Sequence, residues 1–591
     1  MKKIILNCEA CNIDDFERVA EFAKNNNITH VVVSEVEKSI WQWNKCRRDP
    51  YPNWGMYFSS IFKIIVPDEL KKFIPQDYAE RNLDMIVKRA EILKKYDLKA
   101  VFEGMEPAWL DEDVYREHPS WRGPRCDQPR RSRREYYAPC TDNPEVIKLY
   151  DESIYKLCSI VPIEYFSFLT NDSGGGMCWS SRLYPGTNGP QRCRHISVAE
   201  RVTNFLSVVQ NAAARAGVTA EAGFERFFNQ SELQSIVPLL KDGQFCCGYT
   251  NKESAGTKII GWFEYQEPAF PIANMPMPVR FAEMMPAASK NSTSNIYYRI
   301  PSPNSVEYFE LIKGYAGKMD GSVRNRYQNL YSMAAGLIGE KYADKLVDVW
   351  DNINSAYNAL KHLNSGGHIF SLGTVHQRWL TRPLVAFPFE LSDEERAYYK
   401  DYLFQAGTEE ESENLVNLQG HVWLSGYSSH VQIKNSSKIA LSHISNALDI
   451  LNELLACDDI IDYKDKITEL VLKIRMYRCI INNAYNVIHF QSIMDRTDFL
   501  QQPQETIVKD EQGDLRLNKV NKIIRKEIEN TYEMIDILDS AKTPVFLTSA
   551  TEETEDIMRF GPNIRNDFLK KIDIMENHRY DFNRLYKSFN I

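Results

Sequence analysis

The chain has 591 residues, of which 43% are hydrophobic and 26% charged, and a formal net charge of −9. This is the composition of an ordinary globular protein, and the length predicts more than one domain because single cores rarely exceed about 300 residues. The negative charge argues against nucleic acid or an anionic membrane surface as the main partner.

The amino terminus and the cysteines bear on compartment and metals. The sequence M-K-K-I-I-L-N-C has too short an apolar run for a signal peptide. The chain also has no run of about 18 apolar residues, so no membrane span is predicted. The sequence as it stands therefore predicts a cytoplasmic protein, or a periplasmic one if a leader was removed. Two sets could be read as zinc ligands: Cys178, Cys193 and His195, or Cys126 and Cys140. Neither has paired C-x-x-C spacing, so we expect reduced, buried thiols, no metal and no cofactor.

Residues 1–304 alternate between short apolar runs and amphipathic stretches. Helical spacing of apolar residues predicts helices at 13–25, 78–96, 143–159 and 198–216. The apolar runs predict eight strands, at residues 3–9, 30–36, 99–106, 165–172, 219–225, 243–250, 258–265 and 294–301. Eight strands in about 300 residues suit an α/β protein with a (β/α)8 TIM-type barrel, here with weak or missing helices after strands six and seven. A doubly wound open sheet is the alternative.

Residues 305–591 carry long amphipathic stretches with few strand signals. These predict an α-helical domain, possibly of two subdomains, with helices at 306–319, 341–363, 392–406, 437–456, 465–491 and 516–542. A polar and aromatic segment between helices, G-T-V-H-Q-R-W-L-T-R-P, contains Arg378 and Trp379. It either meets the barrel mouth and contacts substrate there, or joins the two domains.

Three long insertions follow predicted strands two, three and four. Because the carboxyl ends of barrel strands lie on one face, we expect these insertions to surround one cleft. They are rich in Trp, Tyr and Arg, and aromatic rings bordered by hydrogen-bonding groups suit sugars as well as other small ligands. An arginine cluster at 130–134 could bind a carboxylate, or it is a solvated loop. Candidate sugar platforms are Trp41, Trp54, Trp109 and Trp179.

Acidic residues recur at the predicted strand ends. The run I-E-Y-F-S-F-L-T-N-D-S-G-G-G reads as a buried strand that delivers Asn171 and Asp172 onto a glycine-rich loop. Hydrolysis of a glycosidic bond needs two carboxyl groups, and we expect Asp172 as the general acid. Glu264, across the mouth on strand seven, is the expected nucleophile or base, with Glu221 as the alternative. Asn171 and Glu106 are expected to contact the substrate.

Two stretches resemble known glycosidases. The run Y-A-P-C-T-D-N-P-E-V-I-K-L-Y, followed by the Asp172 strand, resembles the middle of glycoside hydrolase barrels of the α-glucuronidase and β-N-acetylhexosaminidase type. The run R-P-L-V-A-F-P-F-E-L-S-D-E-E is similar to part of the helical domain after the barrel in α-glucuronidases. The resemblance implies a glycosidase that cleaves a complex glycan through two carboxyl groups and has a carbohydrate as its partner.

The chain also departs from this pattern. It has Asp172 where many such enzymes have Glu, and it has no Asp-Glu pair at that strand end. A non-catalytic carbohydrate-binding protein on a degenerate barrel is therefore the alternative function. A metal-dependent isomerase or lyase is a third, which the scarcity of histidine at strand ends disfavours. The sequence leaves the sugar, the linkage, the stereochemical outcome and the oligomeric state open.

Overall fold

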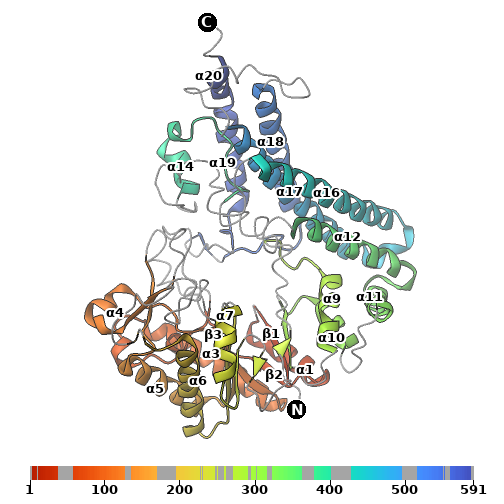
Figure 1. The fold of residues 1–591 in the computed structure, drawn as a ribbon. Helices are drawn as coiled ribbons and strands as arrows, with labels where there is room; N and C mark the ends of the chain where they lie inside the picture. The colour runs from red at the N-terminus through yellow and green to blue at the C-terminus, as the bar shows by residue number, and fades with distance from the viewer. Residues whose placement is uncertain are drawn as a thin grey trace.

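The structure is a computed structural model of the chain (Figure 1). It describes residues 3–9, 11–37, 58–126, 135–169, 193, 195–226, 228, 230–246, 249–250, 259–260, 271–289, 295–300, 302–315, 323–361, 378–400, 427–494, 516–549, 551–552 and 559–587.

Eight parallel strands form the main sheet, in the order β10-β11-β1-β2-β3-β6-β7-β8. Each overlaps one of the eight predicted strands. They are β1 (Ile4–Cys8), β2 (His30–Val32), β3 (Lys99–Met105), β6 (Ile163–Leu169), β7 (Glu221–Arg226), β8 (Gln244–Cys246), β10 (Ile259–Ile260) and β11 (Asn295–Ile300). A short β9 (Tyr249–Thr250) extends the sheet antiparallel to β8, and β4 (Arg122–Arg125) pairs with β5 (Tyr137–Pro139) separately.

The sheet is curled into a TIM-type barrel. Buried side chains from six of its strands form one interior cluster. In a flat sheet β11 and β8 would lie about 29 Å apart, since six steps of about 4.8 Å separate them. Their contribution to one cluster requires a closed curvature, which excludes the open doubly wound alternative. The members are Ile5, Val32, Val101, Tyr165, Phe245 and Tyr297.

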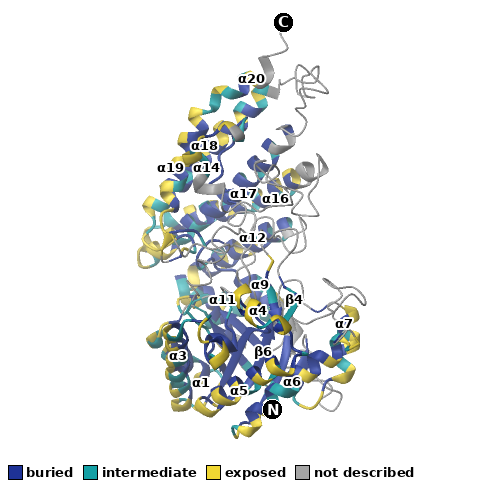
Figure 2. Cartoon of the chain, turned by 90° about the vertical axis from the view of Figure 1, so that its left-hand side faces the viewer, coloured by how far each residue is buried: buried dark blue, intermediate teal, exposed yellow. Residues whose placement is uncertain are grey.

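Helices cover the outside of the barrel, with exposed residues on their outer faces and buried strands behind them (Figure 2). Four begin at polar N-caps whose side chains accept a backbone N–H, namely Asn12, Asp111, Asn143 and Ser197. Pro144 occupies the first turn after Asn143, where proline is favoured. The barrel helices are α1 (Ile13–Asn25), α3 (Gln76–Lys95), α4 (Glu112–Glu117), α5 (Pro144–Ile160), α6 (Val198–Arg215) and α7 (Gln230–Ile236).

The expected lack of a helix after the seventh strand was wrong. Helix α9 (Pro278–Ser289) begins at the last proline of the run E-P-A-F-P-I-A-N-M-P-M-P, whose prolines argued against a helix after the seventh strand. Proline is tolerated in the first turn of a helix, where its missing N–H would have had no partner.

The second half of the chain is helical, as predicted. None of the described helices has the length and apolar character needed to cross a membrane. The helices are α10 (Val306–Tyr315), α11 (Val323–Ile338), α12 (Ala343–Lys361), α14 (Asp393–Lys400), α16 (Tyr427–Leu455), α17 (Lys464–Met494), α18 (Arg516–Ser540), α19 (Ile564–Asn577) and α20 (Phe582–Lys587).

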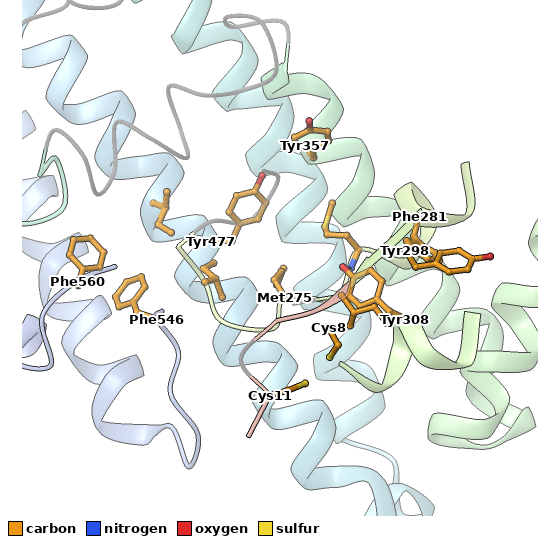
Figure 3. Packing of buried hydrophobic residues seen from close by; sticks show 14 of the residues in the cluster. Cys8, Cys11, Met275, Phe281, Tyr298, Tyr308, Tyr357, Tyr477, Phe546 and Phe560 are labelled. Carbon is orange, nitrogen blue, oxygen red and sulfur yellow. The ribbon is translucent and has the colours of Figure 1, made fainter. Parts of the chain in front are cut away.

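One apolar core runs from the barrel into these helices. Phe281 of α9 packs against Tyr298 of β11 and Tyr308 of α10, with ring centroids 6.1 and 5.4 Å apart (Figure 3). Residues 271–273 also pair with residues 545–547, through hydrogen bonds from Ala273 N to Val545 O and from Leu547 N to Pro271 O. The expected boundary at residue 304 is thus crossed by shared packing and remains a prediction.

The orientation of the barrel positions its functional face. The N terminus lies at the end of the barrel away from the C-terminal helices (Figure 1). Because β1 starts beside the N terminus and its neighbours are parallel to it, the carboxyl ends of the strands face the helices.

Candidate active site at the carboxyl ends of the strands

A charged cluster lies inside the barrel, one layer above the apolar interior cluster. Arg299 of β11 donates from Nη2 to Glu103 Oε1 at 2.6 Å and from Nε to Glu9 Oε1 at 2.7 Å. Asn7 of β1, in register with Arg299, donates from Nδ2 to Glu103 Oε2 at 3.3 Å. We call Asn7, Glu9, Glu103 and Arg299 the polar floor.

Alternation along the strands places these residues inside the barrel. Ile5 and Asn7 lie two apart on β1, as do Val101 and Glu103 on β3, so each pair faces the same side. The first member of each pair belongs to the interior cluster, so the second points inward one step nearer the carboxyl end. The polar floor therefore closes the barrel beneath its carboxyl face.

The polar floor carries two carboxylates for one guanidinium. The side chain of Glu103 is 5% exposed and that of Glu9 is 24% exposed, so access to solvent increases towards Glu9. Carboxylate oxygens accept hydrogen bonds from hydroxyl groups, and the surplus negative charge favours a neutral ligand over an anionic one. This chemistry suits the hydroxyl groups of a sugar.

Hydrogen bonds from neighbouring elements fix the chain at the carboxyl ends of β1, β2 and β3. Ser34 Oγ donates to Glu103 O at 2.6 Å and accepts from Glu103 N at 2.7 Å, which joins the end of β2 to β3. Arg89 of α3 is buried and donates to the carbonyl groups of Val33, Glu35 and Cys11. The chain after β1 and β2 is thereby fixed to the helix behind it.

Glu106, expected to contact substrate, has a different environment. Glu106 is 0% exposed. Its Oε1 accepts a hydrogen bond from Ile61 N at 2.6 Å, and its Oε2 accepts from Ala108 N at 3.2 Å and from Tyr150 Oη at 2.8 Å. Burial raises the pKa of this carboxyl to about 7, although the hydrogen bonds oppose the shift. Glu106 thus anchors the loops beside the barrel mouth. This buried position does not match the substrate contact that was predicted for it.

Glu221 lies at the opposite end of the barrel from the polar floor. It is the first residue of β7, and its Oε1 accepts from Lys3 Nζ at 2.6 Å. Lys3 immediately precedes β1, so this ion pair lies at the amino ends of the strands. The expectation that Glu221 could be the second carboxylate at the mouth is therefore corrected, since the predicted strand was right but its acidic residue begins the strand rather than ending it.

Three predicted substrate contacts are buried in protein. Trp109 is 4% exposed and packs edge-on against Tyr136, which does not fit a solvent-facing platform. Arg378 pairs with Asp567 of α19 at 3.2 Å, and the carbonyl of Trp379 accepts from Asn483 of α17 at 2.9 Å. The described part of this segment is therefore built into the helical half of the chain rather than into the barrel mouth.

The remaining predicted site residues fall outside the described residues. They include the two leading catalytic candidates, and their roles stay predictions. They are Asn171, Asp172, Glu264, Trp41, Trp54, Trp179 and the arginines at 130–134.

A cavity of about 650 Å³ lies elsewhere, along α11 and α12. Tyr327, Tyr331 and Asp344 are among its lining residues. It belongs to the helical half of the chain and does not include any residue of the polar floor.

Sequence reasoning missed Asn7 and Arg299, and it counted Glu9 and Glu103 among the acidic residues at strand ends without giving them a role. The signal was present: in A-V-F-E-G-M, which follows the exposed Lys99 at the start of β3, and in N-I-Y-Y-R-I a single charged residue interrupts an apolar run. A charged side chain at an inward position of a buried strand needs a partner.

Together, a parallel eight-stranded barrel, a polar floor beneath its carboxyl face and an appended helical region define a protein of the TIM-barrel class. Among solved structures the chain is similar to a GH138 enzyme targeting pectin rhamnogalacturonan II. The TM-score is 0.54 at 9% identity, and the alignment covers 100% of this chain and 68% of the other. At this identity the likeness concerns the fold.

Two further matches have lower TM-scores and add nothing to the argument. An O-GlcNAc hydrolase of Thermobaculum terrenum has a TM-score of 0.38 at 10% identity, over 99% of this chain and 96% of the other. A chitobiase of Flavobacterium johnsoniae has a TM-score of 0.34 at 10% identity, over 89% and 74%. No family model and no curated protein matches the chain.

Proposed function

We propose that this chain is a glycoside hydrolase that cleaves a glycosidic bond of a complex glycan at the carboxyl face of its barrel. The observation that carries the proposal is the polar floor, which offers hydrogen-bond acceptors at the end of the barrel where such enzymes work. The fold shared with an enzyme that targets a pectic polysaccharide supports it.

The position of β6 supports Asp172 as the general acid. Leu169, the last residue of β6, pairs with Met105 at the end of β3, and its carbonyl accepts from Glu106 N at 2.9 Å. Ser167 pairs with Glu103 of the polar floor. Asp172 follows Leu169 by three residues in the sequence, so a few residues of chain separate it from the level of the floor.

The proposed roles follow the chemistry of glycoside hydrolysis. Asp172 protonates the glycosidic oxygen as its bond to the anomeric carbon breaks. Glu264 either attacks that carbon or activates a water molecule for the attack. The polar floor accepts hydrogen bonds from hydroxyl groups of the bound sugar, and its surplus negative charge stabilises positive charge that develops on the ring. The identity of the sugar and any likeness to α-glucuronidases or hexosaminidases remain part of this proposal.

The experiment is a digestion screen over plant, bacterial and animal glycans, with mass spectrometry of the products. The wild-type protein is expected to release a sugar from at least one of them. Asp172→Asn and Glu264→Gln should then each lose most of this activity, because each removes one of the two carboxyl groups. Full activity in both variants would refute the assigned roles, and glycan binding without cleavage would favour the non-catalytic alternative. For an active wild type, the anomer first formed, observed by NMR, distinguishes retention from inversion.

A further inference from the structure

Two cysteines from separate loops lie together beside the barrel. Cys140 follows β5, and Cys193 precedes α6. Their sulfur atoms and a carboxylate oxygen of Asp142 all lie within 4.8 Å of one another. Cys140 is 2% exposed and Cys193 is 1% exposed, and both are present as thiols. No local pattern indicates this pair, since the two cysteines are far apart in the chain.

The backbone at both cysteines is fixed. Cys140 N donates to Trp121 O at 2.7 Å, and Cys193 O accepts from Ile196 N at 3.0 Å. The guanidinium of Arg201 on α6 also donates to Cys193 O, and to Ile196 O at 2.5 Å. The two sulfurs therefore lie close together at positions that the surrounding hydrogen bonds maintain.

The third member of the group argues against a metal ion. Arg201 Nε donates to Asp142 Oδ2, and the two side chains are 0% and 7% exposed. A divalent cation at Asp142 would lie next to this buried guanidinium, where the repulsion is strong. Structural zinc also takes four ligands, and the described residues offer two thiols beside a carboxylate that is already paired.

We propose that Cys140 and Cys193 form a disulfide bond in the folded protein, in contrast to the reduced thiols expected from the sequence. A disulfide is uncharged and suits a buried position beside an ion pair. It needs a sulfur–sulfur distance of about 2.05 Å.

The bond forms by exchange with a small disulfide such as glutathione disulfide while the chain folds. One cysteine thiolate attacks a sulfur of the glutathione disulfide, which gives a mixed disulfide and releases one glutathione thiolate. The second cysteine thiolate attacks the protein sulfur of the mixed disulfide and releases the second glutathione thiolate. Two protein thiols are oxidised, one glutathione disulfide is reduced, and the two protons go to solvent or to the released thiolates.

The bond would close a loop that contains α5, β6 and the sequence position of Asp172. It would therefore tie the end of β5 to the segment just before α6. A cross-link of this kind stabilises a protein mainly by restricting its unfolded chain.

The test compares protein folded with glutathione disulfide and protein kept in dithiothreitol. Each sample is denatured and alkylated with N-ethylmaleimide, and its intact mass is measured by mass spectrometry. Tryptic peptides are then mapped. We expect two of the twelve cysteines to escape alkylation in the oxidised sample, in a linked Cys140–Cys193 peptide that is absent after reduction. Reduction should lower the Tm by roughly 2–4 °C, since about 2–4 kcal/mol is spread over the large unfolding entropy of a chain of this length.

A matched variant separates the cross-link from the loss of a buried thiol. Cys126 is 1% exposed, and its Sγ donates to Tyr136 O at 3.3 Å, outside the group. Cys126→Ser should keep the redox-dependent Tm shift, whereas Cys140→Ser should abolish it. Alkylation of all twelve cysteines in the oxidised sample, a different linked pair, or one tightly bound zinc per chain by elemental analysis would overturn the proposal.

Discussion

Arg299 is the residue on which the polar interior of the barrel depends. Its guanidinium donates to Glu103 and Glu9, which come from different parts of the chain. Removing a buried ionic partner leaves an uncompensated charge, which costs more than the pair itself contributes. The three members of this ion cluster should therefore tolerate substitution very unequally.

Arg299→Met should lower the free energy of unfolding by about 3–5 kcal/mol, because it leaves two carboxylates facing each other inside the barrel. Glu9→Gln is the control, since its side chain is 24% exposed and water can replace the partner, so that its cost should stay below about 1 kcal/mol. Urea denaturation of both variants measures the difference. Equal costs would contradict the buried character of the cluster.

Glu106 should make stability depend on pH. Burial raises its pKa to about 7, whereas the unfolded chain releases this proton near pH 4.5. Between these values the folded state holds a proton that the unfolded state has lost. The stabilisation is complete below pH 4.5 and is lost as the pH rises towards 7, by up to about 3 kcal/mol.

The buried Lys63 affects a different pH range. Burial lowers its pKa to about 7, so between pH 7 and its unfolded value the unfolded state holds the extra proton, and stability rises with pH there. Urea denaturation of wild type and Glu106→Gln at pH 5 and pH 7 isolates the carboxyl. The free energy of unfolding should decrease less from pH 5 to pH 7 in the variant than in the wild type. Identical decreases would show that Glu106 is not the group responsible.

Helices α17, α18 and α19 meet at a buried polar network. Lys571 of α19 donates to Glu527 of α18, with both side chains 0% exposed, and Asn483 and Asn486 of α17 donate to the same carboxylate. Lys571 also donates to Leu380 O at 2.9 Å. This network holds the segment at 378–382 within the helical half of the chain.

Lys571→Met should cost about 3–5 kcal/mol of unfolding free energy, because Glu527 would keep its charge without a cation. Adding Glu527→Gln should recover part of this cost by neutralising the carboxylate. Lys542→Met, which removes an exposed partner of Asp465, is the matched control and should have little measurable effect. A double variant no more stable than Lys571→Met alone would show that the charge is not the cause.

The strands were predictable from sequence and the contacts between them were not. Short apolar runs such as residues 163–169 identify buried strands because all-parallel sheets are covered on both faces. Arg299 and Glu103, however, meet only because the sheet curls, and no local pattern reports an interaction between such distant residues. Glu221 was misplaced because it was counted as a strand-end carboxylate, although it lies near the amino end of the predicted strand at 219–225 and begins β7. The helix at 278–289 was missed because the prolines of the preceding run were taken to exclude a helix after the seventh strand, whereas the last of them, Pro278, begins it.

The barrel and the helical region share one core, which predicts a single unfolding transition. Phe281 of α9 is 3% exposed and lies where the two regions join (Figure 3). Phe281→Ala should cost about 3–5 kcal/mol and lower the stability of both regions together. Hydrogen exchange measured separately for peptides of β6 and α17 tests this. Faster exchange in one region alone would show that the two unfold independently.

The central claim is that chemistry takes place at the carboxyl face of the barrel. Asp172 follows the end of β6 in the sequence, whereas Glu221 begins the neighbouring β7 and pairs with Lys3. The most direct measurement is kcat/KM of Asp172→Asn and Glu221→Gln on a glycan that the wild type cleaves. We expect Asp172→Asn to lose about 10²–10⁴-fold and Glu221→Gln to stay close to wild type. Wild-type activity in Asp172→Asn, or a comparable loss in Glu221→Gln, would contradict the account.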